Sequence, residues 1–481
     1  MLDKYIAKWK QMPIGLKASL AYTICSIFQK CLSFITMPLF TRLLNTEQYG
    51  QYNVYLSWSS ILTIFITLNL SSGSFSTAMV KFEDHRKEYI ASIQNITVVL
   101  GVLFLAIYFL FEESLGRIFE LPTPLICLMV AEILAAFALG CTTGHQRFEF
   151  KYKSVLFITL LIAIASPLLG YLFVINSEER GYARIVGYAL VMIAVGLVLF
   201  VNNAVRGKGG YKKEYWKYAL AFNIPLIPYY LSQVIFNQSD RIMISHMSGT
   251  DKAGMYSVAY TLATVLVFVL NAINNSYVPW FYGKIKEGHQ EENCTMANGI
   301  ALLMAVLLLG VIAISPEIIL IMAGSAYAEA IWVVPPVAMS ILLLFYSQLF
   351  INVEFYYEEK TLLVWGSIGA AVLNIALNAL LIPVFGFVAA GYTTLFSYVV
   401  FAVTNYFTMK VVLRKQAAEE NFFDLPALLG IFAGFTALSF AATALYKLWV
   451  IRYVIIVFVL LVMGINYKKV IHFVKSVLTR K

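Results

Sequence analysis

Four ionisable residues lie inside long apolar stretches of the chain, where a charge is costly. They are Lys30 in "SIFQKCLSF", Glu132 in "MVAEILA", and the neighbours Asp240 and Arg241 in "FNQSDRIMIS". A charge at the centre of a bilayer costs about 2.5–3.5 kcal/mol on insertion scales, so such residues usually face a cavity or a partner. Arginine offers a two-donor fork to a phosphate and lysine a compact charge. We therefore interpret Lys30 and Arg241 as cavity residues that hold an anionic group.

The two acids have two competing interpretations. Glu132 and Asp240 either take up a coupling ion or serve as structural partners of cations. An ion pair between Asp240 and Arg241 would brace helices, and Lys30 would pair with Glu132 or extend toward a water-filled space. The sequence is compatible with both.

Amide side chains accompany these charges. The candidates are Gln29, Asn237, Asn271, Asn274 and Asn275. Amides suit hydroxyl-rich ligands such as sugars, so we assign them to substrate binding together with Lys30 and Arg241. Hydrogen bonding between helices, without any role in substrate binding, explains intramembrane amides about as often as substrate binding does. Asn374 and Asn378, at i and i+4, we interpret mainly as helix-packing residues.

Motifs for catalysis are absent from the sequence. There is no GxxxxGK[ST] loop, HExxH, GxSxG or DxD, and the five histidines form no ligand cluster. The five cysteines contain no CxxC pair and are interpreted as small packing residues. We expect no enzymatic activity, no metal and no cofactor.

Composition places these residues in a polytopic membrane protein. The 481 residues are 60% hydrophobic and 13% charged, with a mean hydropathy of +0.78, whereas soluble domains carry about 25% charged residues. Each apolar run is long enough for a helical span of about 20 residues. We predict fourteen spans, centred at about residues 30, 66, 101, 132, 165, 195, 232, 267, 305, 342, 371, 400, 436 and 460. Leu2 to Trp9, with apolar residues at helical spacing between lysines, is predicted to be an interfacial amphipathic helix.

The basic residues set the orientation. The net charge of +9 comes from short loops between apolar runs, which is typical of cytoplasmic loops rather than of a nucleic-acid surface. Most Lys and Arg fall on the side of the N-terminus, so both termini are predicted to be cytoplasmic. The predicted outer loops hold seven, namely Arg42, Arg117, Arg180, Arg184, Lys252, Lys447 and Arg452.

A polar turn occurs twice. "TEQYGQYNV" at 46–54 returns as "TDKAGMYSV" at 250–258. Six spans separate the copies, so both halves have the same orientation, as in a parallel repeat. The predicted fold is all-α, about 14 transmembrane helices in two six-helix lobes plus two C-terminal helices. The predicted divisions are 1–216, 217–410 and 411–481.

The segment "PLIPYYLSQVIFNQSDRIMISHMSGTDKAGMYSVAY", Pro225 to Tyr260, closely resembles the polysaccharide-transport family of flippases for O-antigen and other oligosaccharide lipids. This family lies within the multidrug/oligosaccharidyl-lipid/polysaccharide exporter superfamily. The residues that carry the resemblance are Pro225 and Pro228, the pair Asp240–Arg241, and Gly254-x-Tyr256. The stretch "FITMPLFTRLLNTEQYGQY" at 34–52 looks like the first repeat of the same family.

The resemblance implies a fold and a function. It implies a V-shaped pair of six-helix bundles around a cavity that opens alternately to the two sides. The implied substrate is an undecaprenyl-diphosphate-linked oligosaccharide, moved from the cytoplasmic to the periplasmic leaflet of a bacterial inner membrane. The partners would be this lipid, the bilayer and a polysaccharide polymerase, with no nucleic acid.

Two other classes of protein compete with this interpretation. A multidrug cation antiporter of the same superfamily would favour intramembrane acids, whereas here the two cations balance the two acids. A membrane glycosyltransferase or polymerase would need catalytic carboxylates or a large outer loop, and the sequence shows neither.

Overall fold

The computed structural model describes residues 12–208, 210–287, 290–359, 361–416 and 422–465. Every regular element in these ranges is a helix, as predicted. The predicted interfacial helix before Pro13 lies outside the described residues. The helices group into two compact units, residues 1–238 (unit 1) and 239–481 (unit 2).

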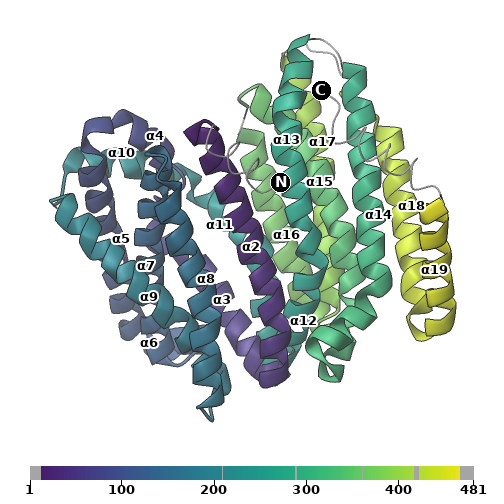
Figure 1. Ribbon diagram of the computed structural model, residues 1–481, viewed down its shortest axis with the longest axis horizontal. Helices are drawn as coiled ribbons and strands as arrows, with labels where there is room; N and C mark the ends of the chain where they lie inside the picture. Colours follow the sequence, from purple (N-terminus) through teal and green to yellow (C-terminus); the bar gives the residue numbers. More distant parts are fainter. Residues whose placement is uncertain (1–11, 209, 288–289, 360, 417–421, 466–481) are drawn as a thin grey trace. The chain divides into compact units, whose positions relative to one another are not determined.

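Unit 1 contains the first repeat and the start of the seventh span (Figure 1). Its helices are α2 (Ile14–Leu43), α3 (Thr46–Thr67), α4 (Phe75–Lys81), α5 (Arg86–Leu110), α6 (Glu112–Phe119), α7 (Thr123–Phe148), α8 (Tyr152–Ile175), α9 (Arg180–Arg206), α10 (Lys213–Asn223) and the first part of α11 (Ile227–Ser248). Two short 3-10 turns interrupt the chain, η1 (Glu83–His85) and η2 (Ile224–Leu226).

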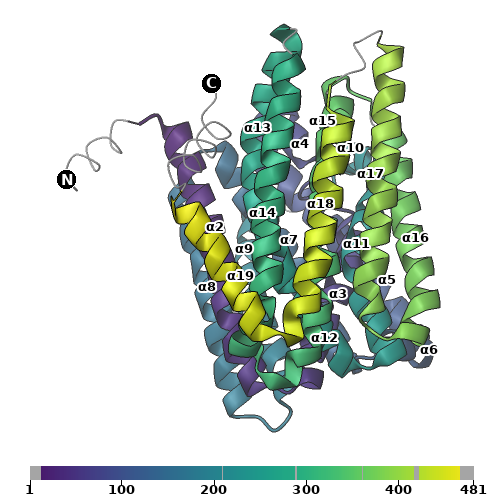
Figure 2. The ribbon, with the colours of Figure 1, turned by 90° about the vertical axis from the view of Figure 1, so that its right-hand side faces the viewer.

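Unit 2 begins within α11 and holds the remaining helices. They are α12 (Thr250–Ala263), α13 (Val267–Glu287), α14 (Gln290–Ala323), α15 (Val334–Tyr356), α16 (Thr361–Phe385), α17 (Ala389–Lys415), α18 (Leu425–Ala444) and α19 (Trp449–Ile465). Three 3-10 segments lie between them, η3 (Thr264–Leu266), η4 (Ser325–Trp332) and η5 (Leu445–Lys447). Figure 2 shows α18 and α19 as a hairpin beside α14.

Twelve helices among the described residues are long and apolar enough to cross a membrane. The predicted span centred at about residue 66 corresponds to α3 and α4 with the break between them, and the one at about residue 460 to the shorter α19. α3 is less apolar because Thr, Gln, Asn and Ser side chains interrupt it. The prediction of a polytopic all-α fold with about fourteen spans is confirmed. The predicted division points at 216/217 and 410/411 stay predictions.

The repeated turn begins a helix in each unit. Asn45 caps α3, because its side-chain oxygen accepts from the backbone nitrogen of Gln48 at 2.8 Å. In return, the side-chain oxygen of Gln48 accepts from the backbone nitrogen of Asn45. Gly249 precedes α12 with a φ of 105°, a conformation that only glycine adopts without strain. The acids Glu47 and Asp251 follow in the first turns, where a negative charge complements the helix dipole.

Both helices that follow the repeated turn are interrupted. α3 ends where Leu68 and Asn69 adopt positive φ angles of 47° and 53°, and α12 passes into α13 through η3. A third interruption, η2, lies between α10 and α11. Asn223 connects two of these breaks in unit 1, since its Nδ2 donates to Ser74 Oγ at 2.7 Å. The polar insert before α4 is therefore tied to the proline-containing start of α11.

Candidate functional site

Asp240 is the centre of a buried polar cluster in unit 2. Its side chain is 1% exposed. Tyr256 Oη and Thr394 Oγ1 donate to Oδ2 at 2.5 Å and 2.8 Å, and Asn378 Nδ2 donates to Oδ1 at 2.6 Å. These donors come from α12, α17 and α16, so one carboxylate ties α11 to three other helices. These three hydrogen bonds satisfy the buried carboxylate and fix its position.

A second layer of side chains holds these donors. Asn374 Oδ1 accepts from Asn378 Nδ2 and from Ser239 Oγ, both at 3.3 Å. Thr393 Oγ1 donates to Asn378 Oδ1. The cluster thus gathers carboxylate, amide and hydroxyl oxygens. Oxygen ligands of this kind suit a proton or a hard monovalent cation, and soft metals prefer other ligands.

Arg241 follows Asp240 but points to a different part of α12. Its Nε donates to Ser257 Oγ at 3.2 Å, and its guanidinium carbon lies 4.6 Å from the ring centroid of Tyr260. Adjacent helical residues are about 100° apart and do not face the same neighbour. Arg241 is half-buried, whereas Asp240 is fully buried. The two charges thus bind different side chains of α12, and both lie near Tyr260.

Glu132 is the buried acid of unit 1. Its side chain, on α7, is 5% exposed and accepts from Tyr55 Oη at 2.7 Å. Tyr188 on α9 is a second hydrogen-bonding neighbour of this carboxylate. Each unit therefore has one intramembrane carboxylate that accepts from a tyrosine of the helix following the repeated turn, Tyr55 in α3 and Tyr256 in α12.

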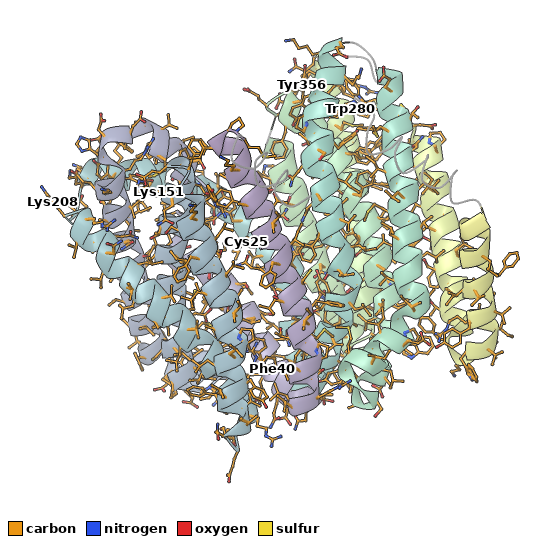
Figure 3. The ribbon with its side chains drawn as sticks, in the orientation of Figure 1. Cys25, Phe40, Lys151, Lys208, Trp280 and Tyr356 are labelled. Atoms are coloured by element: carbon orange, nitrogen blue, oxygen red, sulfur yellow. The ribbon has the colours of Figure 1, made fainter. Side chains whose placement is uncertain are left out.

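Arg184 shares the neighbours Tyr52 and Tyr188 with this acid, although the sequence analysis placed it in an outer loop. It is 6% exposed on α9. Its guanidinium carbon lies 3.7 Å from the ring centroid of Phe40, a residue near the end of α2 (Figure 3), and 4.6 Å from that of Tyr52. Tyr52 contacts Tyr188 edge to face with ring centroids 5.9 Å apart. Aromatic rings and tyrosines thus lie between the buried cation and Glu132.

Gln29 lines an open pocket between α2 and α8 in unit 1. Its Nε2 donates to the carbonyl oxygen of Thr159 at 3.3 Å. The pocket has a volume of about 250 Å³ and also contacts Ser33, Ala163 and Pro167. Pro167 cannot donate to the carbonyl four residues earlier, that of Ala163, which leaves a polar group in the wall. Lys30 belongs to α2, but its side chain lies outside the described residues.

The other predicted amides have varied surroundings. Asn237 Nδ2 donates to the carbonyl oxygen of Gln233 at 2.7 Å, and Asn274 Oδ1 accepts from Asn352 Nδ2 at 3.2 Å. Asn271 and Asn275 are exposed on α13. Gln29 and Asn237 belong to unit 1, and Arg241 with the three asparagines of α13 belongs to unit 2. The substrate-binding role of this set stays a prediction.

The sequence analysis missed two further buried charges, Glu354 and Arg452, and the partly exposed partner of Arg452, Glu317. Glu354 on α15 accepts from Thr408 Oγ1 at 2.5 Å, and its Oε2 has no hydrogen-bond partner among the described residues. Arg452 on α19 forms an ion pair with Glu317 on α14. The only sequence signal was Glu317 within an apolar stretch. No group of three His, Cys, Asp or Glu side chains in the described ranges could hold a metal ion.

The helices, the interrupted spans and the intramembrane charges define a polytopic α-helical transporter fold. The family model described as polysaccharide biosynthesis protein matches residues 16–283, more than half of the chain. This protein belongs to that family, and the resemblance inferred from Pro225–Tyr260 is confirmed.

The curated relatives are distant in sequence, and this chain matches each of them over only part of its length. The chain is 24% identical over 285 residues to Lsg locus putative protein 1 of Haemophilus influenzae, covering 56% of this chain and 67% of that protein. It is 22% identical to succinoglycan biosynthesis transport protein ExoT of Rhizobium meliloti, covering 62% and 60%. It is also 22% identical to Man(5)GlcNAc(2)-PP-dolichol translocation protein RFT1 of Candida albicans, covering 51% and 50%.

Solved structures share the fold. Lipid II flippase MurJ in an inward closed conformation matches with a TM-score of 0.67 and 13% identity, covering 94% of this chain and all of that one. An inward-facing multidrug resistance MATE transporter of the MOP superfamily matches with a TM-score of 0.64 and 13% identity, covering 83% of this chain and all of that one. At this identity the likeness establishes the fold, and that fold is shared by lipid flippases and drug exporters.

Proposed function

We propose that this protein is a flippase for an undecaprenyl-diphosphate-linked oligosaccharide. It moves this lipid from the cytoplasmic to the periplasmic leaflet by alternating access, as a step in surface polysaccharide biosynthesis. Both termini then lie in the cytoplasm of a bacterium, and a polymerase consumes the flipped units. Translocation makes and breaks no covalent bond, so no catalytic residue is assigned.

The placement of Arg241 carries this proposal. A half-buried guanidinium lies within a spanning helix, next to a hydroxyl and an aromatic ring. A diphosphate supplies the negative charge that suits such a cation, and arginine binds phosphate oxygens in a two-donor geometry. Lys30, predicted to lie near the middle of the first span, supplies the second cation.

The names of relatives support the substrate class. One is a transport protein for succinoglycan, and another is a translocation protein for an oligosaccharide linked to PP-dolichol. A protein of the same fold is a lipid II flippase. Hydroxyl-rich sugars suit the amides of α13, of which Asn271 and Asn275 are exposed.

A reconstituted assay tests the function. Purified protein in liposomes would be given a fluorescent undecaprenyl-diphosphate oligosaccharide, and a membrane-impermeant glycosidase would report the fraction in the outer leaflet. The proposal predicts protein-dependent equilibration between leaflets. Glycosidase protection equal to that of protein-free liposomes would contradict it.

The structural match to a multidrug MATE transporter supports a second candidate function, the export of drugs. A drug exporter of this fold would move organic cations, and cations favour aromatic and acidic surroundings. The same liposomes therefore receive ethidium in a parallel experiment. Ethidium transport without oligosaccharide transport would favour the exporter.

A further inference from the structure

A small polar cavity opens at one end of unit 1, and its lining contains none of the residues assigned to transport. It lies between the N-terminal turns of α5 and the C-terminal turns of α7 and α9, and its volume is about 100 Å³. Figure 3 shows Lys151, one of its lining residues, and Lys208 at this end of unit 1. The volume exceeds what a single water needs several times over. This end carries the loops that the positive-inside rule assigns to the cytoplasm.

The wall of the cavity is built from close helix contacts. Gly207 directly follows α9, and a Cβ at this position would lie 2.4 Å from the carbonyl oxygen of Lys87. Glycine therefore lets the end of α9 touch the start of α5. This contact brings Lys87 and Arg206 to the lining of one cavity.

The floor is a fixed network of uncharged polar groups. Asn203 Nδ2 donates to Gln94 Oε1 at 2.7 Å and to Thr142 Oγ1 at 3.0 Å, and Gln94 Nε2 donates to the carbonyl oxygen of Phe200 at 3.3 Å. Gln94 and Thr142 are buried. In the lining, Gln146 Oε1 is buried without a hydrogen-bond partner among the described residues. A buried amide oxygen of this kind accepts from a donor such as a water, and it is not itself a contact for a phosphate oxygen.

Cations dominate the charged groups that face the cavity. Lys87, Lys151 and Arg206 line it together with a single carboxylate, Glu149. Lys151 Nζ lies 2.7 Å from a Glu149 oxygen, and this hydrogen bond lowers the pKa of the Glu149 carboxyl. His145 Nε2 is 3.5 Å from the other Glu149 oxygen. Lys87 and Arg206 take part in neither contact.

Basic residues at helix ends have an ordinary explanation. Cations near a helix C-terminus complement its dipole, and cytoplasmic loops are rich in Lys and Arg. These effects account for the number of cations at this end. They do not account for the convergence of three cations on one cavity with a hydrogen-bonded floor, because like charges repel.

We infer that this cavity binds a phosphate group. Phosphate offers several acceptor oxygens, which match an arginine fork and lysine ammonium groups. Basic pockets between membrane-spanning helices on the cytoplasmic side are suited to anionic lipid headgroups. The phosphate can come from two sources, the headgroup of an anionic phospholipid or a soluble phosphate. This site is separate from the residues proposed to bind the transported lipid.

Binding measurements on the purified full-length protein test the inference. The double variant Lys87→Gln/Arg206→Gln is compared with Lys153→Gln/Lys208→Gln, which removes two exposed cations from the same end of unit 1. Native mass spectrometry measures adducts of phosphatidylglycerol, with phosphatidylcholine as the zwitterionic comparison. A parallel titration with inorganic phosphate measures competition with phosphatidylglycerol.

We expect the Lys87→Gln/Arg206→Gln protein to bind phosphatidylglycerol about ten- to thirtyfold more weakly, since each basic residue near an anionic surface contributes about 1 kcal/mol. All four cations are exposed, but Lys153 and Lys208 do not line the cavity, so the control variant should stay within about twofold of wild type. Competition by millimolar inorganic phosphate in wild type, lost in the double variant, would identify a soluble phosphate as the source. Binding of phosphatidylglycerol without such competition would identify the lipid.

Equal affinity of the double variant and the control for both probes would overturn the inference. A variant that keeps both cations guards against a folding defect. Asn202→Asp, on the lining of the cavity, places a second carboxylate there. It should weaken binding in the same direction, and unchanged binding by a folded Asn202→Asp protein would also contradict the site.

Discussion

The side-chain nitrogen of Asn378 donates to Oδ1 of Asp240 across 2.6 Å and joins α16 to α11 inside unit 2. The oxygen of the same amide accepts from Thr393, so Asn378 also connects α17. All three side chains are buried. If the hydrogen bond from Asn378 to Asp240 were lost, neither water nor a neighbouring side chain would readily replace it.

Removal of this amide should destabilise unit 2. Asn378→Ala removes the donor to Oδ1 of Asp240, whereas the Thr393 hydroxyl keeps its bond to the carbonyl oxygen of Ala390. A buried acceptor left unpaired costs about 1–3 kcal/mol. Thermal unfolding of the detergent-purified protein measures the effect. Asn275→Ala is the matched control, because Asn275 is an exposed asparagine of the same unit. Equal melting temperatures for the two variants would show that the Asp240 cluster contributes little to stability.

Glu132 and Asp240 provide a test of energy coupling. If Glu132 or Asp240 takes up the coupling ion, Glu132→Gln or Asp240→Asn should abolish gradient-driven transport and spare passive exchange. The amides keep the shape of the side chain but carry no negative charge. Transport into vesicles with an imposed proton or sodium gradient measures this. If transport by both variants responded to the proton and sodium gradients as transport by the wild type does, the two acids would have only a structural role.

A close helix crossing in unit 1 gives a prediction that is independent of transport. A Cβ at Gly187 on α9 would lie 2.6 Å from the Cα of Gly170 on α8. We expect Gly187→Ala to destabilise the protein by about 1–3 kcal/mol, as overpacking does. At Gly434 on α18 an added Cβ meets no atom within 4 Å, so Gly434→Ala should be neutral or stabilising. Thermal unfolding of both variants decides, and a similar melting temperature for the two would show that α8 and α9 separate at little cost.

Membrane topology is testable with reporter fusions. Fusions at residues 85, 149, 210 and 415 should report the cytoplasm, and fusions at residues 116, 180 and 325 the opposite side. The reason is the excess of Lys and Arg in the first set of segments. The decisive comparison is between the two copies of the repeated turn, at 46–54 and 250–258. If they lay on opposite sides of the membrane, the parallel repeat would be wrong.

Sequence patterns predicted the fold well because they are local. Apolar runs define the spans, and the repeated turn marks the start of α3 and α12 in the two units. Asp240 and Glu132 were also found by a local rule, since a charge in an apolar run is visible without a structure. The interruption after α3 was visible as the polar insert Asn69–Ser74.

Partners could not be predicted, because they are far apart in the chain. Asn378 lies 138 residues from Asp240, and Arg452 bonds to Glu317 from 135 residues away. Neither pair has a common sequence pattern. Asn378 was interpreted as a packing residue, and it does join helices, but through the carboxylate. Arg184 was assigned to a loop because it stands near a helix start, where the sequence does not show that Phe40 and Tyr52 cover it.

The most direct measurement is the leaflet distribution of lipid-linked oligosaccharide in cells that carry Lys30→Gln, Arg241→Gln or both. These variants lose the cations proposed to hold the diphosphate, and Lys252→Gln, which removes an ion-paired cation at the start of α12, serves as the control. The account predicts membrane insertion at normal levels, oligosaccharide trapped on the cytoplasmic leaflet, and partial activity for Lys30→Arg because the charge is retained. Normal polymer export by well-folded Lys30→Gln, Arg241→Gln and double-variant proteins would contradict it.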